Sequence, residues 1–321
     1  PEVQNLTIAG SLRRMRETIG DVDILITSKE PEKIMEVFVT LPGVVKVWGK
    51  GKTKSSIRIR RSIEFDVDLR VVPEKSFGSA LQYFTGSKEH NIVTRRIAIE
   101  KGLKLSEYGL FRGDTMIPTK TEEEVYATLG LQWIPPEMRE NKGEIELAAQ
   151  GNIPKLVTRK DLQGDLQVQT TWTDGSHSIE QMARAAHAAG LKYIAITDHT
   201  KNLAMTGGLD ETRIKAQWKE IDAINKKFQK EKIDFVILKG SEVDILKDGS
   251  LDLPDEILSQ LDVVGASVHT HFTLPRDAQT ARVIRAMQNP HVDIIFHPTG
   301  RKINRRPPIE LDMDKIIETA K

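Results

Sequence analysis

The chain has 321 residues, of which 29% are charged and 39% are hydrophobic, and its formal net charge at pH 7 is +1. A chain of this length can bury two hydrophobic cores, and the balanced charge excludes a polybasic tail while leaving room for a local basic groove. The absence of cysteine excludes disulfides and thiolate metal sites and fits an intracellular setting. We find neither a signal peptide nor an apolar run long enough to span a membrane.

The N-terminal segment predicts a site for a phosphate group. Residues 3–9 are typical of a short strand, and a helix-like segment opens at Gly10 and Ser11 directly after it. The first turn of a helix offers free N–H groups and a positive dipole end, both of which suit a phosphate. Arg13 and Arg14 add fixed positive charge close by.

Two carboxylates follow at the start of the next strand. Gly20 ends the helix-like segment, and Asp21 and Asp23 fall at alternate strand positions, so both side chains face the same side. The run over residues 62–72 alternates polar and apolar residues, as a half-buried strand does, and one of its faces holds Glu64, Asp66, Asp68 and Arg70. Carboxylates on neighbouring strands beside a phosphate-binding helix start predict a two-metal site for phosphoryl transfer, with Mg²⁺ as the natural ion.

The segment between these strands predicts a helix and a basic hairpin. The helix over residues 31–41 has apolar side chains at helical spacing, which indicates core packing. Residues 43–48 and 55–61 are typical of two strands, and the cations in and between them are Lys50, Lys52, Lys54, Arg58, Arg60 and Arg61. From these residues alone, a solvated hairpin and a contact with a polyanion are both open.

Two more helices are predicted after this sheet. The first covers residues 76–84 and the second covers residues 87–101. Asn91 and Arg95 lie four residues apart, so they share one face of the second helix. Residues 105–150 are typical of a small mixed α/β end to the domain.

In the second half the pattern changes to alternating strands and helices. Four apolar runs, at 193–197, 235–238, 263–268 and 292–296, lead to residues of metal-ligand type, namely His199, Glu242, His269 and His297. Helical segments separate these runs at 179–190, 211–229 and 277–288. The alternation predicts a parallel sheet that forms a barrel, with its site at the C-terminal ends of successive strands. Nitrogen and oxygen ligands without cysteine suit Zn²⁺ or Mn²⁺.

The first half resembles the family X DNA polymerases, the group of DNA polymerase beta. The motifs that match are Gly10-Ser11, Gly20-Asp21-x-Asp23, Asp68-Leu69-Arg70-Val71-Val72-Pro73 and Tyr83-Phe84-Thr85-Gly86-Ser87. The resemblance implies an α/β fold with a palm at residues 1–74, built on a nucleotidyltransferase-type sheet, and a small thumb at residues 75–150.

The same resemblance implies roles for single residues. Asp21, Asp23 and Asp68 are implied to be catalytic and to hold Mg²⁺ or Mn²⁺, with Asp66 as the near neighbour of the third. The residues implied to contact the incoming dNTP are Gly10, Ser11, Arg14, Gly20, Tyr83, Phe84, Gly86 and Asn91. Those implied to contact gapped or primed DNA are Arg95, Lys52, Lys54, Arg58 and Arg60.

The second half resembles the polymerase-and-histidinol-phosphatase (PHP) domain that follows the polymerase in bacterial and archaeal family X enzymes. The resemblance covers residues 164–321, after a linker at 151–163. The motifs that match are Asp165-Leu166-Gln167-Val168-Gln169, Thr173-Asp174-Gly175, Ile196-Thr197-Asp198-His199, Gly240-Ser241-Glu242 and His297-Pro298-Thr299-Gly300-Arg301. It implies a distorted, TIM-like α/β barrel with a trinuclear metal site and 3′–5′ exonuclease or phosphoesterase activity. The implied ligand positions are Asp174, His199, Glu242, His269 and His297.

The chain departs from the PHP pattern at its first strand. Where the family has a His-x-His pair, this sequence has Gln167 and Gln169. Glutamine is a weak neutral ligand, so we expect at least one metal to be lost or loosely held. The resemblance also implies that the final barrel strands of the family, and its N-terminal helix-hairpin-helix module, fall outside these 321 residues.

Three interpretations follow. The leading one is a gap-filling DNA polymerase of repair type, in a prokaryotic cytoplasm at the nucleoid, that binds DNA and dNTP and no membrane. The second is a metal-dependent 3′–5′ exonuclease or phosphoesterase that uses the first half as a DNA platform. The third makes the second half a non-catalytic scaffold.

Overall fold

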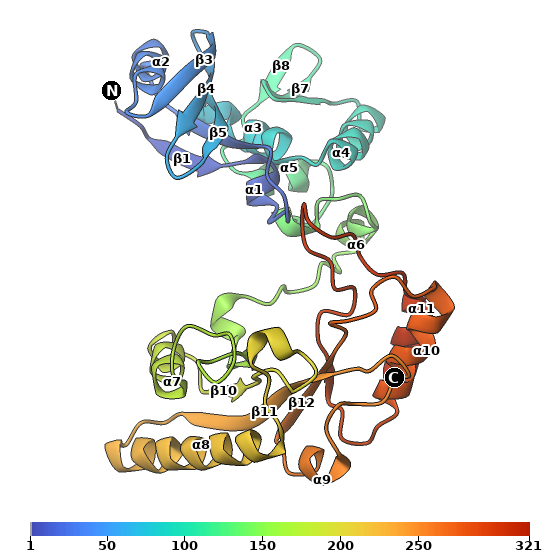
Figure 1. The fold of residues 1–321 in the computed structure, drawn as a ribbon. Helices are drawn as coiled ribbons and strands as arrows, with labels where there is room; N and C mark the ends of the chain where they lie inside the picture. The colour runs from blue at the N-terminus through green and yellow to red at the C-terminus, as the bar shows by residue number, and fades with distance from the viewer. Residues whose placement is uncertain (1) are drawn as a thin grey trace. The chain divides into compact units, whose positions relative to one another are not determined.

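The computed structural model describes residues 2–321, which divide into two compact units between Leu156 and Val157 (Figure 1). Each unit has hydrophobic cores of its own and is described by itself. The boundaries of the palm, thumb, linker and PHP segments stay predictions.

The first unit is organised around a mixed five-stranded sheet. Its strands are β1 (Asn5–Ile8), β2 (Asp21–Thr27), β3 (Val44–Lys50), β4 (Lys54–Arg60) and β5 (Glu64–Val72), in the spatial order β1-β2-β5-β4-β3. Alternation along β4 and β5 places Ile57, Ile59, Val67 and Leu69 on one face, where helix α2 (Pro31–Val39) packs. The opposite face has charged side chains, so the half-buried strands are as predicted.

The predicted helix after Gly10 is wrong beyond its first turn. Helix α1 spans only Gly10–Arg13, and residues 14–20 continue as turns and bends. Met15 has a left-handed backbone with φ 55, and its N–H donates to the carbonyl of Leu12 at 3.1 Å, which ends the helix. Because the dipole of a single turn is small, binding of a phosphate here depends on nearby side chains as well.

The remainder of the first unit is a small mixed α/β layer, as predicted. A 3₁₀ turn at Glu74–Ser76 leads into α3 (Phe77–Thr85), and α4 (Lys88–Glu100) follows. The other elements are β6 (Lys104–Ser106), β7 (Gly109–Arg112), β8 (Thr115–Ile117), α5 (Glu122–Thr128), a 3₁₀ turn at Pro136–Met138 and α6 (Glu144–Ala149). Ser87 and Thr121 cap the N-termini of α4 and α5 with their hydroxyl groups.

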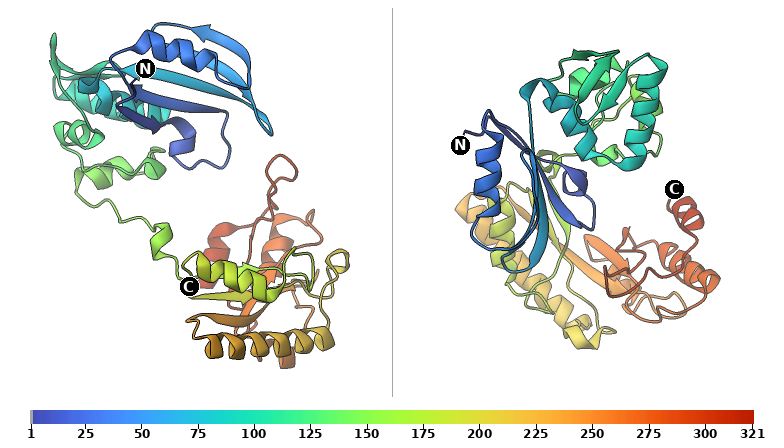
Figure 2. Two further views of the ribbon diagram at one scale, coloured as in Figure 1. Left: turned by 90° about the vertical axis from the view of Figure 1, so that its left-hand side faces the viewer. Right: turned by 90° about the horizontal axis from the view of Figure 1, so that it is seen from above.

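The second unit is organised around a parallel sheet whose strands follow chain order. They are β9 (Gly164–Val168), β10 (Tyr193–Ile196), β11 (Val236–Asp244), β12 (Val263–Ser267) and β13 (Ile294–Ile295). The helices are α7 (Ile179–Ala188), α8 (Glu211–Glu231), α9 (Asp255–Leu258), α10 (Arg276–Met287) and α11 (Met313–Ala320), with 3₁₀ turns at Arg159–Asp161 and Ala204–Thr206. The long helix α8 packs along β11 (Figures 1 and 2).

The predicted alternation of strand and helix is confirmed in the second unit, and its strands form an incomplete barrel over the described residues, as the resemblance implies. Within residues 2–321 the parallel strands form an open sheet, with β9 and β13 at its two edges. Successive parallel strands still end at one side of the sheet, which brings the residues after β10, β11, β12 and β13 together. None of the described helices is long and apolar enough to cross a lipid bilayer.

Candidate active sites

In the first unit, the predicted acidic residues lie on two adjacent strands. β2 and β5 pair in parallel, with Asp21 opposite Asp66 and Asp23 opposite Asp68. Residues two apart on a strand face the same side, so four carboxylates share one face of the sheet. This is the face that α2 does not cover.

Asp66 and Asp68 differ in their partners. Asp66 accepts two hydrogen bonds of 2.8 Å from the guanidinium of Arg58 and one of 2.9 Å from the indole of Trp48. These contacts lower the pKa of Asp66 to about 2. Asp68 meets the ammonium of Lys54 at 3.0 Å. Asp68 therefore has more freedom than Asp66 to bind an ion.

Asp23 lies in an environment that favours a cation. Burial, and then the negative charges of Asp21 and Asp68, raise the pKa of Asp23 to about 6. Gly10 allows this position, because a Cβ there would lie 2.0 Å from Oδ2 of Asp23. Carboxylate oxygens that repel one another suit a hard divalent ion such as Mg²⁺ or Mn²⁺.

Asp21 and Asp23 lie two residues apart on β2, and Asp68 lies opposite Asp23 on β5, but the carboxylate oxygens of the three do not form a tight cluster. Among the described residues, one group of acidic and histidine side chains has ligand atoms all within 4.8 Å of one another, and it is in the second unit. Joint binding of an ion by Asp21, Asp23 and Asp68 therefore requires their side chains to converge. Their roles stay predictions.

A cavity of about 350 Å³ lies beside these carboxylates and brings together most residues predicted to bind a nucleotide. Its lining includes Gly10, Ser11, Arg14, Asp21, Asp23, Tyr83, Phe84, Gly86, Asn91 and Arg95, together with Thr85 and Lys88. Gly20 is outside this lining. The cavity joins the start of α1 to the end of α3 and one face of α4, so three separate sequence motifs meet around one space.

Arg14 and Arg13 point to different partners. Arg14 lines the cavity and donates to the carbonyl of Thr85 and to Glu140, at 2.5 and 2.9 Å. Arg13 instead makes a two-pronged pair with Glu122, at 2.8 and 2.7 Å, and does not line the cavity. The expectation that both arginines supply charge to a phosphate is therefore supported for Arg14 alone.

Glu122 is a residue that the sequence reasoning missed. It is 3% exposed and pairs with both Arg13 and the fully buried Arg139, which also contacts the backbone of Ile134. Burial alone would raise the pKa of Glu122, but hydrogen bonds from the two arginines lower it to about 2. The acidic run at residues 122–124 was visible in the sequence, but its partners were not.

Asn91 is held in place inside the cavity wall. Its amide donates to the carbonyl of Tyr83 at 2.7 Å and accepts from Gln82 at 2.8 Å. Arg95 donates to the carbonyl of Asn91 at 3.2 Å, one helical turn away. These bonds join α3 to α4 and fix the shape of the cavity.

The predicted DNA-binding cations of the hairpin are paired with carboxylates. The pairs are Lys52 with Glu32 at 3.1 Å, Lys54 with Asp68 at 3.0 Å, Arg58 with Asp66 at 2.8 Å and Arg60 with Glu64 at 2.5 Å. All of these side chains are at least partly exposed, so the pairs are weak and can exchange for phosphate. The face is thus a row of alternating charges, and its contact with DNA stays a prediction.

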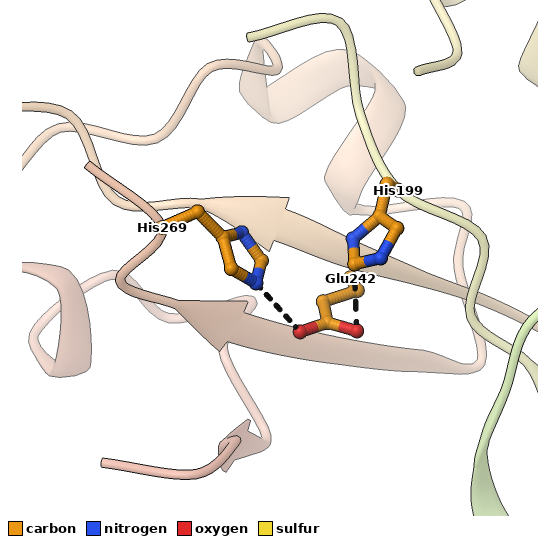
Figure 3. A group of neighbouring side chains, drawn as sticks. All are labelled: His199, Glu242 and His269. Carbon is orange, nitrogen blue, oxygen red and sulfur yellow. Dashed lines mark ion pairs between the residues drawn. The ribbon is translucent and has the colours of Figure 1, made fainter. Parts of the chain in front are cut away.

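In the second unit, the predicted ligands gather around one buried carboxylate. Glu242 is 1% exposed, and His199 and His269 point toward it from the ends of the neighbouring strands (Figure 3). Nε2 of His269 and Nε2 of His297 lie 3.1 and 2.7 Å from Oε1 of Glu242. Asp174 is at the rim, 3.7 Å from Nε2 of His199. The structure therefore brings together all five predicted positions.

Two observations test whether this group fits a metal ion. Nδ1 of His199 is buried without a hydrogen-bond partner and lies 3.7 Å from Oε2 of Glu242, as a free ligand nitrogen would. The side-chain amides of Gln167 and Gln169, however, both donate to Oε2 of Glu242, at 3.2 and 2.9 Å. An N–H group is a donor and cannot bind a cation, so the residues fit one ion better than the three implied by the resemblance.

Asp244 is a second residue that the sequence reasoning missed. It pairs with Nδ1 of His269 through a short hydrogen bond, and Asn202 donates to its other oxygen at 2.5 Å. Burial alone would lower the pKa of His269, but hydrogen bonds with Asp244 and Glu242 raise it to about 9. An aspartate behind a histidine orients the ring and increases its basicity. Asp244 stands two residues after Glu242 on β11, but its role can be recognised only once the position of His269 is known.

Comparisons with known proteins match both units of the chain. Residues 80–140 match the family model described as DNA polymerase beta thumb, and residues 165–297 match that of the PHP domain. The DNA polymerase/3′-5′ exonuclease PolX of Bacillus subtilis is 44% identical over 315 residues, which is 98% of this chain and 54% of that protein. A repair DNA polymerase X of African swine fever virus is 32% identical over 144 residues, which is 42% of this chain and 82% of that protein.

Further similarities concern each unit separately. A probable phosphatase of Thermoanaerobacter sp. (strain X514) is 38% identical over 149 residues, which is 45% of this chain and 54% of that protein. The structure of Leishmania infantum polymerase beta in a ternary complex is 26% identical, covers 42% of this chain and 67% of that chain, and has a TM-score of 0.39. The chain spans about half the length of the first of these curated relatives.

The sheet, the cavity and the two matched family models define the class. The first unit is of the DNA polymerase beta type, and the second is a PHP domain. The chain belongs to the family X DNA polymerases, because it covers most of a family member at 32% identity.

Proposed function

We propose that the protein is a template-directed DNA polymerase of repair type that fills gaps by adding a dNTP to a primer 3′-hydroxyl. The observation that carries this proposal is the cavity beside Asp21 and Asp23, which three motifs line together. The names of the relatives, a repair polymerase and a polymerase with exonuclease activity, support the same conclusion. Such a role belongs in the cytoplasm of a prokaryote, at the nucleoid.

Each group in and beside the cavity has a task in this reaction. Ser11 and Arg14 bind the triphosphate, since both line the cavity and Arg14 is held by its contact with Thr85. Asp21, Asp23 and Asp68 hold two Mg²⁺ or Mn²⁺ ions, which when bound lower the pKa of the primer hydroxyl and neutralise the leaving pyrophosphate. The rings of Tyr83 and Phe84, which pack edge to face with their centroids 5.2 Å apart, line the cavity and contact the sugar of the dNTP.

Primer extension on gapped DNA tests this proposal. Wild-type protein should add the templated nucleotide in the presence of Mg²⁺ or Mn²⁺ and should be inactive in EDTA. A matched reaction with the wrong dNTP controls for template direction. Failure to extend gapped or primed DNA with either metal would refute the polymerase role.

For the second unit we propose a weakened metal-dependent phosphoesterase that acts on DNA 3′ ends. The specific observation is that His199, Glu242 and His269 keep a ligand group while Gln167 and Gln169 occupy one oxygen of Glu242. Zn²⁺ or Mn²⁺ suits this set of donors. A nuclease assay on labelled 3′ ends over a range of Mn²⁺ concentrations should give slow cleavage that the change Gln167→His with Gln169→His accelerates. Rapid cleavage by the wild type that this change leaves unaltered would contradict the proposal.

A further inference from the structure

A narrow hairpin follows the last histidine of the second-unit site. We name residues 300–306 the basic finger; it projects from the body of the second unit (Figure 2). The N–H of Lys302 donates to the carbonyl of Arg306 at 3.0 Å, and the reverse bond is 2.9 Å. Asn304 has a left-handed backbone at the tip, which is the conformation that tight turns require. The finger is therefore a defined structure with its own backbone bonds.

The base of the finger is fixed to the loop after β12. The guanidinium of Arg306 lies 3.8 Å from the ring centre of Phe272, and its Nε donates to the carbonyl of Gly300 at 2.8 Å. The N–H of Ile309 donates to the carbonyl of Thr299 at 2.9 Å and closes the base. Phe272 follows His269 by three residues, so the same two loops hold the finger and two of the predicted ligands.

The finger has an unusual charge. Its seven residues include four cations, namely Arg301, Lys302, Arg305 and Arg306, and no carboxylate. Lys302 and Arg305 are exposed, and within the part of the chain that the structure describes neither has a carboxylate at ion-pair distance. Four hairpin cations of the first unit, Lys52, Lys54, Arg58 and Arg60, are paired, whereas these two are available to an outside anion. Two such cations, held on a fixed loop, suit a polyanion.

The position of the finger specifies what that anion is. His297, whose Nε2 is 2.7 Å from Glu242, precedes Lys302 by five residues, so the two Cα atoms are at most roughly 18 Å apart. Nucleotides of one DNA strand in a helical conformation are spaced by about 3.4 Å. A strand with a phosphate ester at Glu242 would therefore reach the finger within about five nucleotides. A small phosphate ester that fills the site alone does not extend this far.

We propose that the basic finger binds the phosphate backbone of single-stranded DNA whose 3′ end enters the second-unit site. Lys302 and Arg305 make the contacts, and Arg306 positions them through Phe272. The direction of the strand rests on the proposed phosphoesterase role, but the binding itself does not. The finger is thereby a specificity element that favours polynucleotides over small phosphate esters.

The test compares the full chain with the double variant Lys302→Ala with Arg305→Ala. The matched control is Lys226→Ala with Lys230→Ala, two exposed lysines of α8 for which the structure gives no ion pair. Binding of a fluorescent oligo-dT is measured by anisotropy over a range of salt concentrations. Loss of two phosphate contacts should reduce the slope of log K against log salt by about 1.4, and the control should not change it.

Hydrogen exchange then locates the contact, because the first unit also binds DNA in the proposed function. Peptides within residues 297–309 should gain protection in the wild type when oligo-dT is added, and in the double variant they should not. Primer extension on gapped DNA should be equal in all three proteins.

Specific outcomes overturn the proposal. A salt slope equal to that of the control, with no protection of residues 297–309, removes the finger from DNA binding. Protection by poly-glutamate and not by oligo-dT assigns the finger to an acidic protein instead. If none of the proteins degrades a 3′ end but the binding difference persists, the phosphoesterase proposal fails and the finger proposal is retained.

Discussion

Asp66 and Asp68 are two residues apart on one strand, and their contacts separate their expected roles. The carboxylate of Asp66 is neutralised by Arg58 and accepts a hydrogen bond from Trp48, whereas Asp68 lies opposite Asp23 and meets one exposed lysine. We expect Asp68→Ala to reduce dNTP addition by about a thousandfold, roughly 4 kcal/mol in the barrier, because a metal ligand is lost. Single-turnover primer extension measures this rate. Asp66→Ala is the matched control and should retain activity within about tenfold; the reverse ranking would mean that the wrong carboxylate was assigned.

Glu122 offers a prediction about stability. Its carboxylate is buried between Arg13 and Arg139, so Glu122→Gln leaves two guanidinium groups without their charged partner. Breaking a buried pair on one side costs about 3–5 kcal/mol, and urea titration at pH 7 should show this loss in the first unit. Glu123→Gln is the matched control, because the neighbouring side chain is exposed. Equal stability of the two variants would contradict this account.

The pH dependence of the same contact has a defined sign. The pKa of Glu122 is about 2 in the folded protein against the ordinary value of 4.5. A carboxyl group whose pKa is lower in the folded protein than in the unfolded chain stabilises the fold at any pH above its unfolded pKa. The contribution of Glu122 is therefore complete above about pH 4.5 and is lost as the pH falls toward 2. The difference in free energy of unfolding between the wild type and Glu122→Gln should therefore shrink over this range. A difference that stays constant from pH 7 to pH 2.5 would mean that the ionised carboxylate does not stabilise the fold.

At the scale of elements, alanine substitutions at Gly10 and Gly20 test whether the turn at the start of α1 positions Asp23. Gly10 has φ 64, and a Cβ there would overlap Asp23 at 2.0 Å, whereas a Cβ at Gly20 meets nothing within 4 Å. We expect Gly10→Ala to displace the carboxylate and reduce primer extension by about a hundredfold, since a shift of about 1 Å at a reacting group costs this much. Gly20→Ala should remain near the wild type. Equal losses would indicate that Gly20 also contacts the nucleotide, although it does not line the cavity.

Strands were the elements that sequence patterns predicted best, for a physical reason. Alternation along residues 64–72 reports which face of the sheet is buried, and the parallel register then sets Asp68 opposite Asp23. The same logic predicted His199 and Glu242, because consecutive parallel strands end at one side of a sheet. Helix α1 was predicted too long, because the left-handed turn at Met15 has no signal in residue type.

Such patterns could not predict residues whose partners are distant in the sequence. Glu122 and Arg139 are 17 positions apart in the chain, and Arg13 is 109 positions from Glu122. Nothing local distinguishes Glu122 from its exposed neighbours Glu123 and Glu124. Only the approach of Arg13 and Arg139 in the folded chain distinguishes it, and the same holds for Asp244 behind His269.

Across the whole molecule, the two sites handle buried negative charge in opposite ways. In the first unit, Asp23 is close to other carboxylates and its raised pKa reports charge that the protein itself does not neutralise. In the second unit, burial alone would raise the pKa of Glu242, but hydrogen bonds from His269, His297 and Ser267 hold it well below its ordinary value. A site of the first kind needs a cation to be electrostatically balanced, and a site of the second kind does not.

This contrast leads to a prediction about the metal dependence of stability. In the wild type, donors from Gln167 and Gln169 already satisfy Glu242, so EDTA or Mn²⁺ should change the unfolding temperature of the second unit little. In the variant Gln167→His with Gln169→His, imidazole nitrogens replace the amide donors and can bind an ion in the folded state only. At a Mn²⁺ concentration of about 100 times Kd this binding contributes about 2.7 kcal/mol, which raises the unfolding temperature by on the order of 5–10 °C for a unit of this size.

Calorimetry with and without EDTA measures this rise in unfolding temperature. The control for added histidine is Gln150→His with Gln229→His, at two exposed glutamines away from the site. If EDTA lowered the unfolding temperature of this unit by several degrees in the wild type, the site would bind a metal tightly despite the glutamines, which would contradict this prediction.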